Sequence, residues 1–517
     1  MFETNFNKAN SEEINFKLIC PYQFHRMFRR SVGMEDDLRD LLVYEVFNCN
    51  GFNFTQFLSE ELGMEDMGFI ASKTDQNYLS TWKNIEGCDA SRFYLYPKND
   101  KNNRLPDRQS NSEISFIFDK IKESQEYSYE STESDDGSES YSYDIFDPYG
   151  VRMFTVRPCC PYCHTLLPDM WFSDFIKSYL PIALIAGKSG GKTTYMTSLL
   201  DRNFRQILKG MGGIIQWDVD TGIQYEEDIF KIQQTRFENL NRLINGKYPR
   251  PTDYVMPPVC IKITKMDSDG NKALGHILVS IFDCKGELYE KLGKNAATDE
   301  EMQFLNFMHS YIFLVDHFQM AGIDSFEPLM SVAEQGKFQK ENAHDSITAE
   351  KILENHRDNS DNKDENLYRV LVSLKKFLSR YGNGKDLKHI AYTIVKSDEL
   401  QKFPETLKRV DGMADLLKQD DGLDTFNPDN FAGVDYIVQE FFSKIVFNAK
   451  RNDSMDIMRS MGGKQVSKSW HCISVARKLP PERQTEEKER ECEFYPVRIA
   501  EPFARCIREE MKRLNWL

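Results

Sequence analysis

Residues 180–200 read LPIALIAGKSGGKTTYMTSLL, which is an apolar run, a glycine-rich turn and then a helical pattern. Four residues fit the phosphate-loop pattern, with Ala in place of the usual first Gly: Ala186, Gly191, Lys192 and Thr193. The alternative is a glycine-rich turn that holds no ligand. A strand before the turn and a helix after it form the setting in which this pattern binds phosphate, so we expect a nucleotide here.

The same turn predicts individual contacts to the phosphates. Glycines let backbone N–H groups face phosphate oxygens, which bulky side chains would obstruct. We expect Lys192 to reach the β and γ phosphates as a point charge, and Thr193 to ligate Mg²⁺ through its hydroxyl. The helix that begins near Lys192 adds its positive N-terminal end. The expected nucleotide contacts are Gly187, Lys188, Ser189, Gly190, Gly191, Lys192, Thr193 and Thr194.

A second apolar run, in HILVSIFDCKGELYE (276–290), ends in Asp283, with Gly286 three residues later. A carboxylate at this place would hold Mg²⁺ through water, and the backbone N–H of Gly286 would meet the γ phosphate. Asp-x-x-Gly turns are common in loops. This turn is a candidate nucleotide contact because it follows a predicted strand and lies downstream of the phosphate loop.

A third apolar run, in HIAYTIVKSDEL (389–400), ends in Lys396, Ser397 and Asp398. The carboxylate of Asp398 can accept both the ring N–H and the exocyclic amine of guanine, whereas adenine presents the wrong pattern. The stem of Lys396 can lie over the base plane. Ser474, in the next apolar run, is expected to support the base from the other side. Together these residues favour guanine over adenine.

Beyond residue 151, short apolar runs alternate with amphipathic stretches, which is typical of an α/β fold with a mostly parallel sheet flanked by helices. The predicted strands are 182–185, 259–264, 277–282, 311–315, 389–395 and 471–475. The predicted helices follow Lys192 and cover 366–381, 434–449 and 501–517.

Composition divides the chain into four parts. They are a mixed N-terminal domain at 1–122, an acidic Ser/Tyr-rich linker at 123–147, a zinc-ribbon-like segment at 148–178, and a phosphate-loop domain at 179–517 with a polar insertion near 341–365. The linker is predicted because its residues offer too little apolar surface to offset the entropy of ordering. An acidic docking tail is the alternative interpretation of that segment.

Charge and hydropathy limit the partners and the compartment. The net charge of −15 argues against a broad nucleic-acid-binding surface. The longest apolar stretch, 179–186, is too short to span a bilayer, and the first residues lack the basic-then-apolar order of a signal peptide. We therefore expect a cytoplasmic protein whose eleven cysteines are thiols or metal ligands.

The sequence Cys160-Pro-Tyr-Cys163 has the C-x-x-C spacing that lets two thiolates bind one tetrahedral zinc ion. Cys20, in CPYQ, and Cys49 are the first candidates to complete a structural four-cysteine site. The further candidate ligands are His25, Cys88, Cys159 and His164. The alternative is a degenerate ribbon in which the cysteines are buried thiols, because a structural site normally needs all four ligands.

Taken in order, AGKSGGKT, DCKGE, VKSD and ISVA resemble the TRAFAC class of GTPases. The motifs CPYCHTLLP (160–168), VDHFQM (315–320) and VRIAEPF (497–503) look like those of the bacterial double-GTPase (DO-GTPase) family, over about 157–517. The resemblance implies a P-loop GTPase fold, a zinc ribbon before it, and GTP and Mg²⁺ as ligands. It also implies protein partners from one gene system of prokaryotic conflict or defence.

One further segment and one departure bear on this resemblance. GKYPRPTD (246–253) resembles the family's first switch, which makes Thr252 a second hydroxyl ligand of Mg²⁺ and Arg250 a charge stabiliser or a plain surface residue. Val395 stands where the family has Asn or Thr, which removes a polar brace beside Lys396.

A second departure concerns turnover. Glu287 stands where relatives of Ras carry a water-positioning Gln, and its carboxylate adds negative charge beside the γ phosphate. It therefore predicts slow or partner-stimulated hydrolysis. The residues expected to act in hydrolysis are Lys192, Glu287 and Thr252.

The sequence favours an Mg²⁺-dependent GTP switch that acts through protein partners, without direct nucleic-acid contact or a membrane span. One alternative is a non-hydrolysing nucleotide-binding scaffold, which Glu287 and the long polar insertions favour. The other is an ATPase, which Val395 favours and Asp398 opposes.

Overall fold

The computed structural model describes residues 43–48, 56, 60, 67–71, 93–97, 127–131, 143–160, 167, 176–187, 190–199, 215–220, 238–239, 241–245, 247, 258–269, 272–283, 286–294, 298–299, 302–317, 366–381, 386–417, 431–446, 453–478 and 492–516. The insertion predicted near 341–365 lies outside these ranges. None of the helices within them has the length and apolar character needed to cross a membrane.

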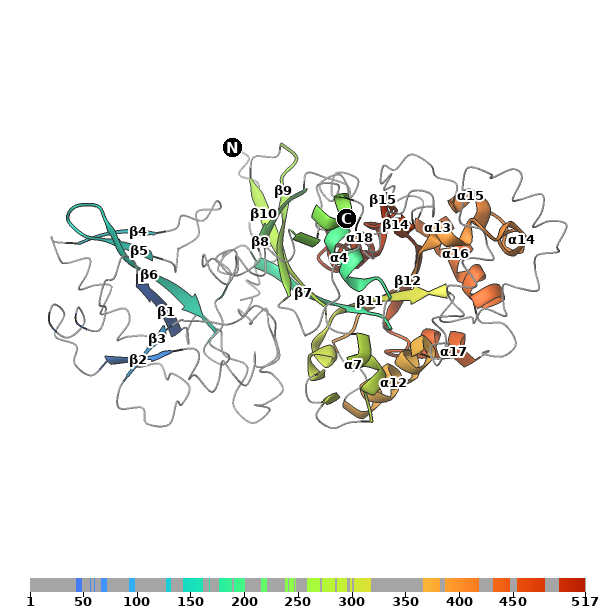
Figure 1. The fold of residues 1–517 in the computed structure, drawn as a ribbon, viewed down its shortest axis with the longest axis horizontal. Helices are drawn as coiled ribbons and strands as arrows, with labels where there is room; N and C mark the ends of the chain where they lie inside the picture. Colours follow the sequence, from blue (N-terminus) through green and yellow to red (C-terminus); the bar gives the residue numbers. More distant parts are fainter. Residues whose placement is uncertain are drawn as a thin grey trace, which may run out of the picture.

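The larger of the two main sheets has seven strands, in the order β13-β12-β11-β7-β10-β9-β8 (Figure 1). The strands are β7 (Ile176–Ile185), β8 (Ile215–Asp220), β9 (Val259–Met266), β10 (Ala273–Phe282), β11 (Ser310–Asp316), β12 (His389–Val395) and β13 (Ser467–Cys472). Neighbours from β10 to β13 pair in parallel, whereas β9 and β8 add antiparallel pairs at one edge. The prediction of a mostly parallel sheet is confirmed.

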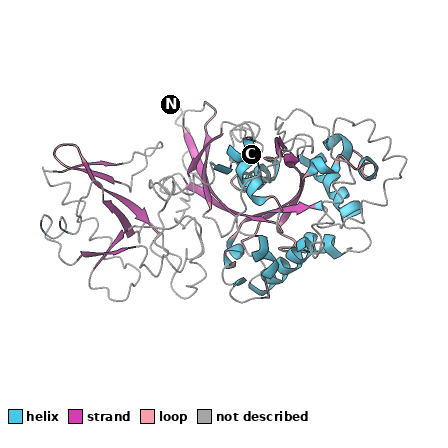
Figure 2. Cartoon of the chain, in the orientation of Figure 1, coloured by secondary structure: helices cyan, strands magenta, loops and turns pink. Residues whose placement is uncertain are grey.

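Helices cover both faces of this sheet (Figure 2), which explains why its central strands read as continuous apolar runs. Successive residues of a strand point to opposite faces. In β7, Leu180 and Leu184 accordingly join one buried cluster, whereas Tyr179, Ala183 and Ile185 join the other.

Each cluster has its own set of helices. The cluster with Leu180 and Leu184 includes residues of α4 (Lys192–Leu199) and α18 (Glu501–Arg513). The longer helices that contribute residues to the cluster with Tyr179 and Ile185 are α7 (Gly286–Lys291), α12 (Asn366–Tyr381), α16 (Phe431–Phe441) and α17 (Asp453–Ser460).

Shorter elements complete this part of the chain. They are the 3₁₀ helix η6 (Gln303–Phe307), α13 (Ser397–Leu400), α14 (Pro404–Leu407), α15 (Met413–Leu417), the π-helical turn η10 (Phe442–Val446), and the antiparallel pair β14 (Ser474–Lys478) and β15 (Cys492–Val497).

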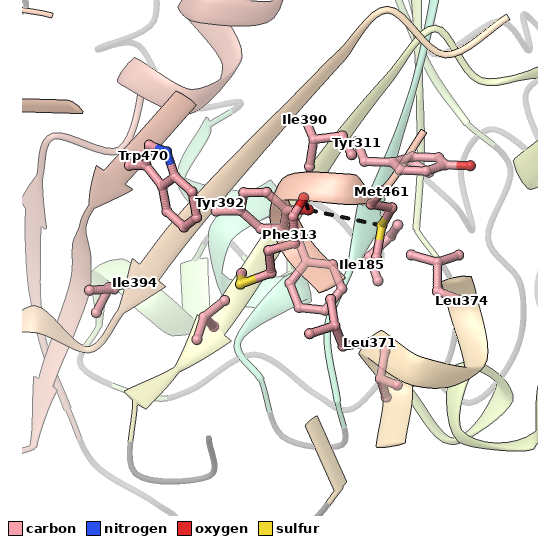
Figure 3. Close-up of a cluster of buried hydrophobic side chains, with 14 of the residues drawn as sticks. Ile185, Tyr311, Phe313, Leu371, Leu374, Ile390, Tyr392, Ile394, Met461 and Trp470 are labelled. Carbon is pink, nitrogen blue, oxygen red and sulfur yellow. Dashed lines mark hydrogen bonds between the residues drawn. The ribbon is translucent and has the colours of Figure 1, made fainter. Parts of the chain in front are cut away.

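Aromatic side chains fix the sheet to its helices on the face covered by α12 and α17 (Figure 3). The ring of Tyr392 stacks on Trp470 with centroids 4.9 Å apart and lies tilted against Phe313 at 5.9 Å. Such pairs contribute about 0.5–1.5 kcal/mol each beyond the area they bury. The Tyr392 hydroxyl donates to the carbonyl oxygen of Met458 at 2.9 Å, which ties α17 to β12.

The second main sheet has six antiparallel strands, in the order β2-β3-β1-β6-β5-β4 (Figure 1). They are β1 (Val43–Asn48), β2 (Met67–Ala71), β3 (Phe93–Pro97), β4 (Ser128–Ser131), β5 (Tyr143–Phe146) and β6 (Arg152–Cys159).

Two of these strands correct the prediction of a linker at 123–147. β4 and β5 lie inside that segment, and Ile145 of β5 is fully buried. In YSYES and YSYDIF, aromatic or aliphatic residues alternate with polar ones, which is the period of a strand with one covered face. The acidic composition concealed this alternation. β6 likewise occupies part of the segment predicted as ribbon-like.

Most of the predicted elements in the larger sheet are confirmed. The strand at 389–395 and the helix at 366–381 have the predicted bounds. The strand predicted at 471–475 is wrong, because β13 ends at Cys472 and β14 begins at Ser474. The helix predicted at 434–449 begins at Phe431 and becomes π-helical at Phe442.

Candidate functional site

The candidate site lies at the carboxyl edge of the parallel strands. Because β10, β7, β11, β12 and β13 run in one direction, the residues that follow them meet at the same edge of the sheet. After β7 the chain forms β8, β9 and β10, which lie on one side of β7 in the sheet. It then crosses to form β11, which lies on the other side of β7. The point where the strand order reverses in this way is called a topological switch point. Open α/β sheets bind ligands there, outside the carboxyl ends of the strands.

The phosphate loop closes tightly between β7 and α4. A Cβ at Gly190 would lie 2.7 Å from the Cβ of Ala186 and 3.0 Å from the carbonyl oxygen of Gly187, so glycine alone fits. The backbone N–H of Gly190 donates to that carbonyl oxygen at 3.2 Å. Gly191 has a φ of +78°, in the left-handed region that favours glycine. Both glycines are therefore required by the backbone of the loop.

Lys192 connects the phosphate loop to the Asp-x-x-Gly element. It is the first residue of α4, is 8% exposed, and its ammonium lies 5.7 Å from the ring centroid of Tyr289 on α7. The Tyr289 hydroxyl donates to the carbonyl oxygen of Leu184 at 2.7 Å, which fastens α7 to the end of β7. The predicted phosphate loop and the predicted Asp-x-x-Gly element are thus neighbours in the structure.

Thr193 and Asp283 are the predicted ligands of Mg²⁺. Asp283 directly follows β10 and is buried, and Thr193 is half-buried in the first turn of α4. Hydroxyl and carboxylate oxygens suit Mg²⁺, a hard cation that keeps several of its waters. The donor chemistry of the two residues fits the predicted ion.

Lys396 is held by the strand next to its own. Its ammonium lies 2.5 Å from Oδ2 of Asp316, which is fully buried at the end of β11. Burial lowers the pKa of Lys396, but the carboxylates of Asp316, Glu399 and Asp398 outweigh this and leave the pKa above its ordinary value. Lys396 is therefore a charged group at neutral pH.

Asp398 and Ser474 are in direct contact, which the sequence did not predict. The hydroxyl of Ser474 donates to Oδ1 of Asp398 at 2.7 Å. The backbone N–H of Ser397 donates to the carbonyl oxygen of Ile473 at 3.1 Å, so the loops after β12 and β13 are joined. The structure brings together the residues expected to recognise a base.

The remaining predicted site residues fall into two groups. Lys188, Ser189, Thr252 and Arg250 lie outside the described residues. Thr194 is half-buried in α4, and Gly286 and Glu287 are the first two residues of α7.

The cysteines predicted to bind zinc are described only in part. Cys160 is fully buried after β6, whereas Cys20, Cys49 and Cys163 lie outside the described ranges. Among the residues that the structure describes, no group of three or more His, Cys, Asp or Glu side chains is arranged to hold a metal ion. The four-cysteine zinc site stays a prediction from sequence.

The strand, glycine loop and helix, followed by Asp283 at the end of the adjacent parallel strand, define the architecture of the site. It is consistent with a P-loop GTPase-like fold. No protein-family model matches the sequence, and no curated protein matches it. The resemblance to double-GTPases accordingly stays a prediction from sequence motifs.

Two solved structures show a weak likeness. The S. cerevisiae Ski7 GTPase-like domain bound to GDP and inorganic phosphate has a TM-score of 0.23 and 11% identity, over 65% of this chain and 51% of that chain. The same domain bound to GTP has a TM-score of 0.21 and 11% identity, over 58% of this chain and 43% of that chain. The chain spans about half the length of the solved chains it matches. At these scores the likeness carries no argument about function.

Sequence reasoning did not assign roles to Asp316 and Tyr289. Asp316 ends an apolar run, as Asp283 does, so its place at the carboxyl edge was readable from the sequence. Its contact with Lys396 could not be predicted from the sequence, because the two residues are 80 positions apart. Tyr289 offered no signal, since a tyrosine in a short helix is most often a packing residue.

Proposed function

We propose that the chain binds GTP with Mg²⁺ at the carboxyl edge of the seven-stranded sheet, hydrolyses it slowly, and acts as a switch through protein partners. The observation that supports this most is the glycine loop between β7 and α4, where Gly190 approaches Ala186 too closely for any side chain. A loop of this kind turns backbone N–H groups toward an anion at the start of a helix.

The charges around the loop support the proposal of phosphate binding. Lys192 and the N-terminal end of α4 supply positive charge where the β and γ phosphates would lie. Mg²⁺, when bound through Thr193 and Asp283, would neutralise further charge on the phosphates. Phosphoryl transfer to water needs positioning and charge neutralisation, so no covalent intermediate is required.

Guanine preference is proposed from Asp398. Its carboxylate is the acceptor for the ring N–H and the amine of guanine, and Ser474 fixes its orientation. An ATPase would have no use for a carboxylate oriented in this way.

Slow hydrolysis is proposed from Glu287. It follows Gly286 at the start of α7, beside the expected position of the γ phosphate. A carboxylate there can orient water but also adds negative charge next to the phosphate. We expect Glu287→Gln to raise turnover of GTP. The action through partners, and a role in bacterial defence, are proposed on the sequence resemblance alone.

Titration calorimetry of GTP, GDP and a non-hydrolysable ATP analogue into the full chain with Mg²⁺ tests the proposal. The expected result is binding of guanine nucleotides that is lost in Lys192→Ala and kept in Lys444→Ala, an exposed lysine paired with Glu440. Binding of ATP in preference to GTP would support the ATPase, and binding without turnover would support the scaffold. Absence of any nucleotide binding would overturn the proposal.

A further inference from the structure

Asp316 and Val395 are register partners at the ends of the parallel strands β11 and β12. Val395 precedes Lys396 and is buried, but its side chain has no polar atom that could hold the lysine. The neighbouring strand supplies the missing group, because Asp316 is fully buried and its Oδ2 lies 2.5 Å from the Lys396 ammonium.

The backbone and the charges both constrain Lys396. Its φ of +59° and ψ of 39° are left-handed, a conformation that a non-glycine residue adopts at a cost. Three carboxylates influence the ammonium: Asp316, Asp398 and Glu399. Of these, Asp316 makes the ion pair at 2.5 Å, and it lies at the end of the neighbouring strand β11.

We infer that Asp316 is a positioning residue for base recognition, which it serves by keeping the Lys396 ammonium from Asp398. This inference rests on the proposed function. Asp398 accepts from Ser474 and must also accept from guanine. If Lys396 lost its partner, its ammonium would turn to the remaining carboxylates and occupy the acceptor that reads the base. Pre-organisation of the lysine also avoids ordering a flexible side chain when the base binds.

The test measures dissociation constants of GDP and ADP, by competition against a fluorescent guanine nucleotide, in the full chain. Asp316→Asn is expected to weaken GDP about tenfold while ADP changes less than about twofold, which lowers the base preference. The matched control is Asp299→Asn, another buried acid, whose Oδ2 lies 3.3 Å from Arg380 away from the site. It is expected to leave the ratio of the two constants unchanged.

A double-mutant cycle separates positioning from stability. Lys396→Met keeps the apolar stem, and the variant with both changes removes both charges of the ion pair. If Asp316 acts through Lys396, the double variant should have the same base preference as Lys396→Met alone. A further loss of preference in the double variant overturns the inference, even if Asp316→Asn alone does not fold.

Two other outcomes are decisive. An unchanged ratio in a folded Asp316→Asn overturns the inference and leaves nucleotide binding by the wild-type chain intact. If the wild-type chain binds no nucleotide, the proposed function and the inference both fail.

Discussion

The hydroxyl of Ser474 donates a 2.7 Å hydrogen bond to Oδ1 of Asp398, although 76 positions separate the two residues. The bond joins the loops that follow two adjacent parallel strands, β12 and β13. It orients the carboxylate that we expect to read guanine.

The first prediction concerns this pair. Asp398→Asn should shift preference from guanine toward xanthine nucleotides, because the amide offers a donor where the carboxylate accepted. Ser474→Ala should weaken GDP by roughly threefold to tenfold, the effect of one hydrogen bond. Calorimetry with GDP and xanthosine diphosphate checks both, with Asp415→Asn on α15 as the control. Unchanged base preference in Asp398→Asn would count against a GTPase.

The second prediction concerns the tight glycine of the phosphate loop. Gly190→Ala should weaken GTP by at least about tenfold, because its Cβ would lie 2.7 Å from that of Ala186 and displace the loop. Adding Ala186→Gly should recover part of the affinity, since it removes one of the two clashes. Gly433→Ala, in α16, is the control. A Cβ added there would meet no neighbouring side chain among the described residues within 4 Å, so the change should raise stability by about 0.5–1 kcal/mol. Wild-type affinity in Gly190→Ala would contradict the loop geometry.

The third prediction concerns Glu510, which fastens α18 to the sheet. Ser178 and Arg513 donate hydrogen bonds to its carboxylate. Burial would raise the pKa of Glu510, but the bonds from Arg513 and Ser178 and the charge of Lys388 hold it below its ordinary value. Its contribution to stability is therefore present above about pH 4.3 and is lost as the pH falls through the lowered value.

Glu510→Gln should accordingly lower the free energy of unfolding by about 1–3 kcal/mol at pH 7, and by less below about pH 4. Urea unfolding at both pH values measures this. Glu509→Gln is the matched control, because Glu509 pairs with Lys512 at the surface and should cost at most about 1 kcal/mol. A deficit that does not depend on pH would show that the charge of Glu510 is not what stabilises the helix.

The fourth prediction concerns the buried His389, whose ring nitrogens bond to the hydroxyls of Ser467 and Ser469. Burial holds its pKa well below the ordinary value, and nearby charges add to the effect. These charges are on Arg505, His471, Lys512 and Lys468. As the pH falls, the histidine is therefore protonated in the unfolded chain before it is protonated in the folded one. The free energy of unfolding has its full value above about pH 6.5 and decreases below it.

His389→Gln, which can keep both hydrogen bonds, should flatten this dependence by up to about 1.4 kcal/mol per pH unit. Unfolding free energies between about pH 7 and pH 5 check it against the wild type. An equal slope in the two proteins would exclude His389 as the source.

Local sequence was enough to specify the phosphate loop, the central strands and the order of the site motifs. Each of these features is readable within a short window: a glycine pattern, an apolar run of strand length, and a polar residue where the run ends. The helix at 366–381 was predictable for the same reason, since its apolar residues repeat at helical spacing.

Which of these residues touch was a matter of tertiary structure. Strand pairing set Asp316 beside Val395 and the ammonium of Lys396, and it brought Ser474 to Asp398. Such contacts join residues far apart in the chain, and a one-residue change of register would break them without changing any local pattern. The sequence by itself therefore determines which side chains lie at the carboxyl edge. Which of them are in contact depends on how the strands pair.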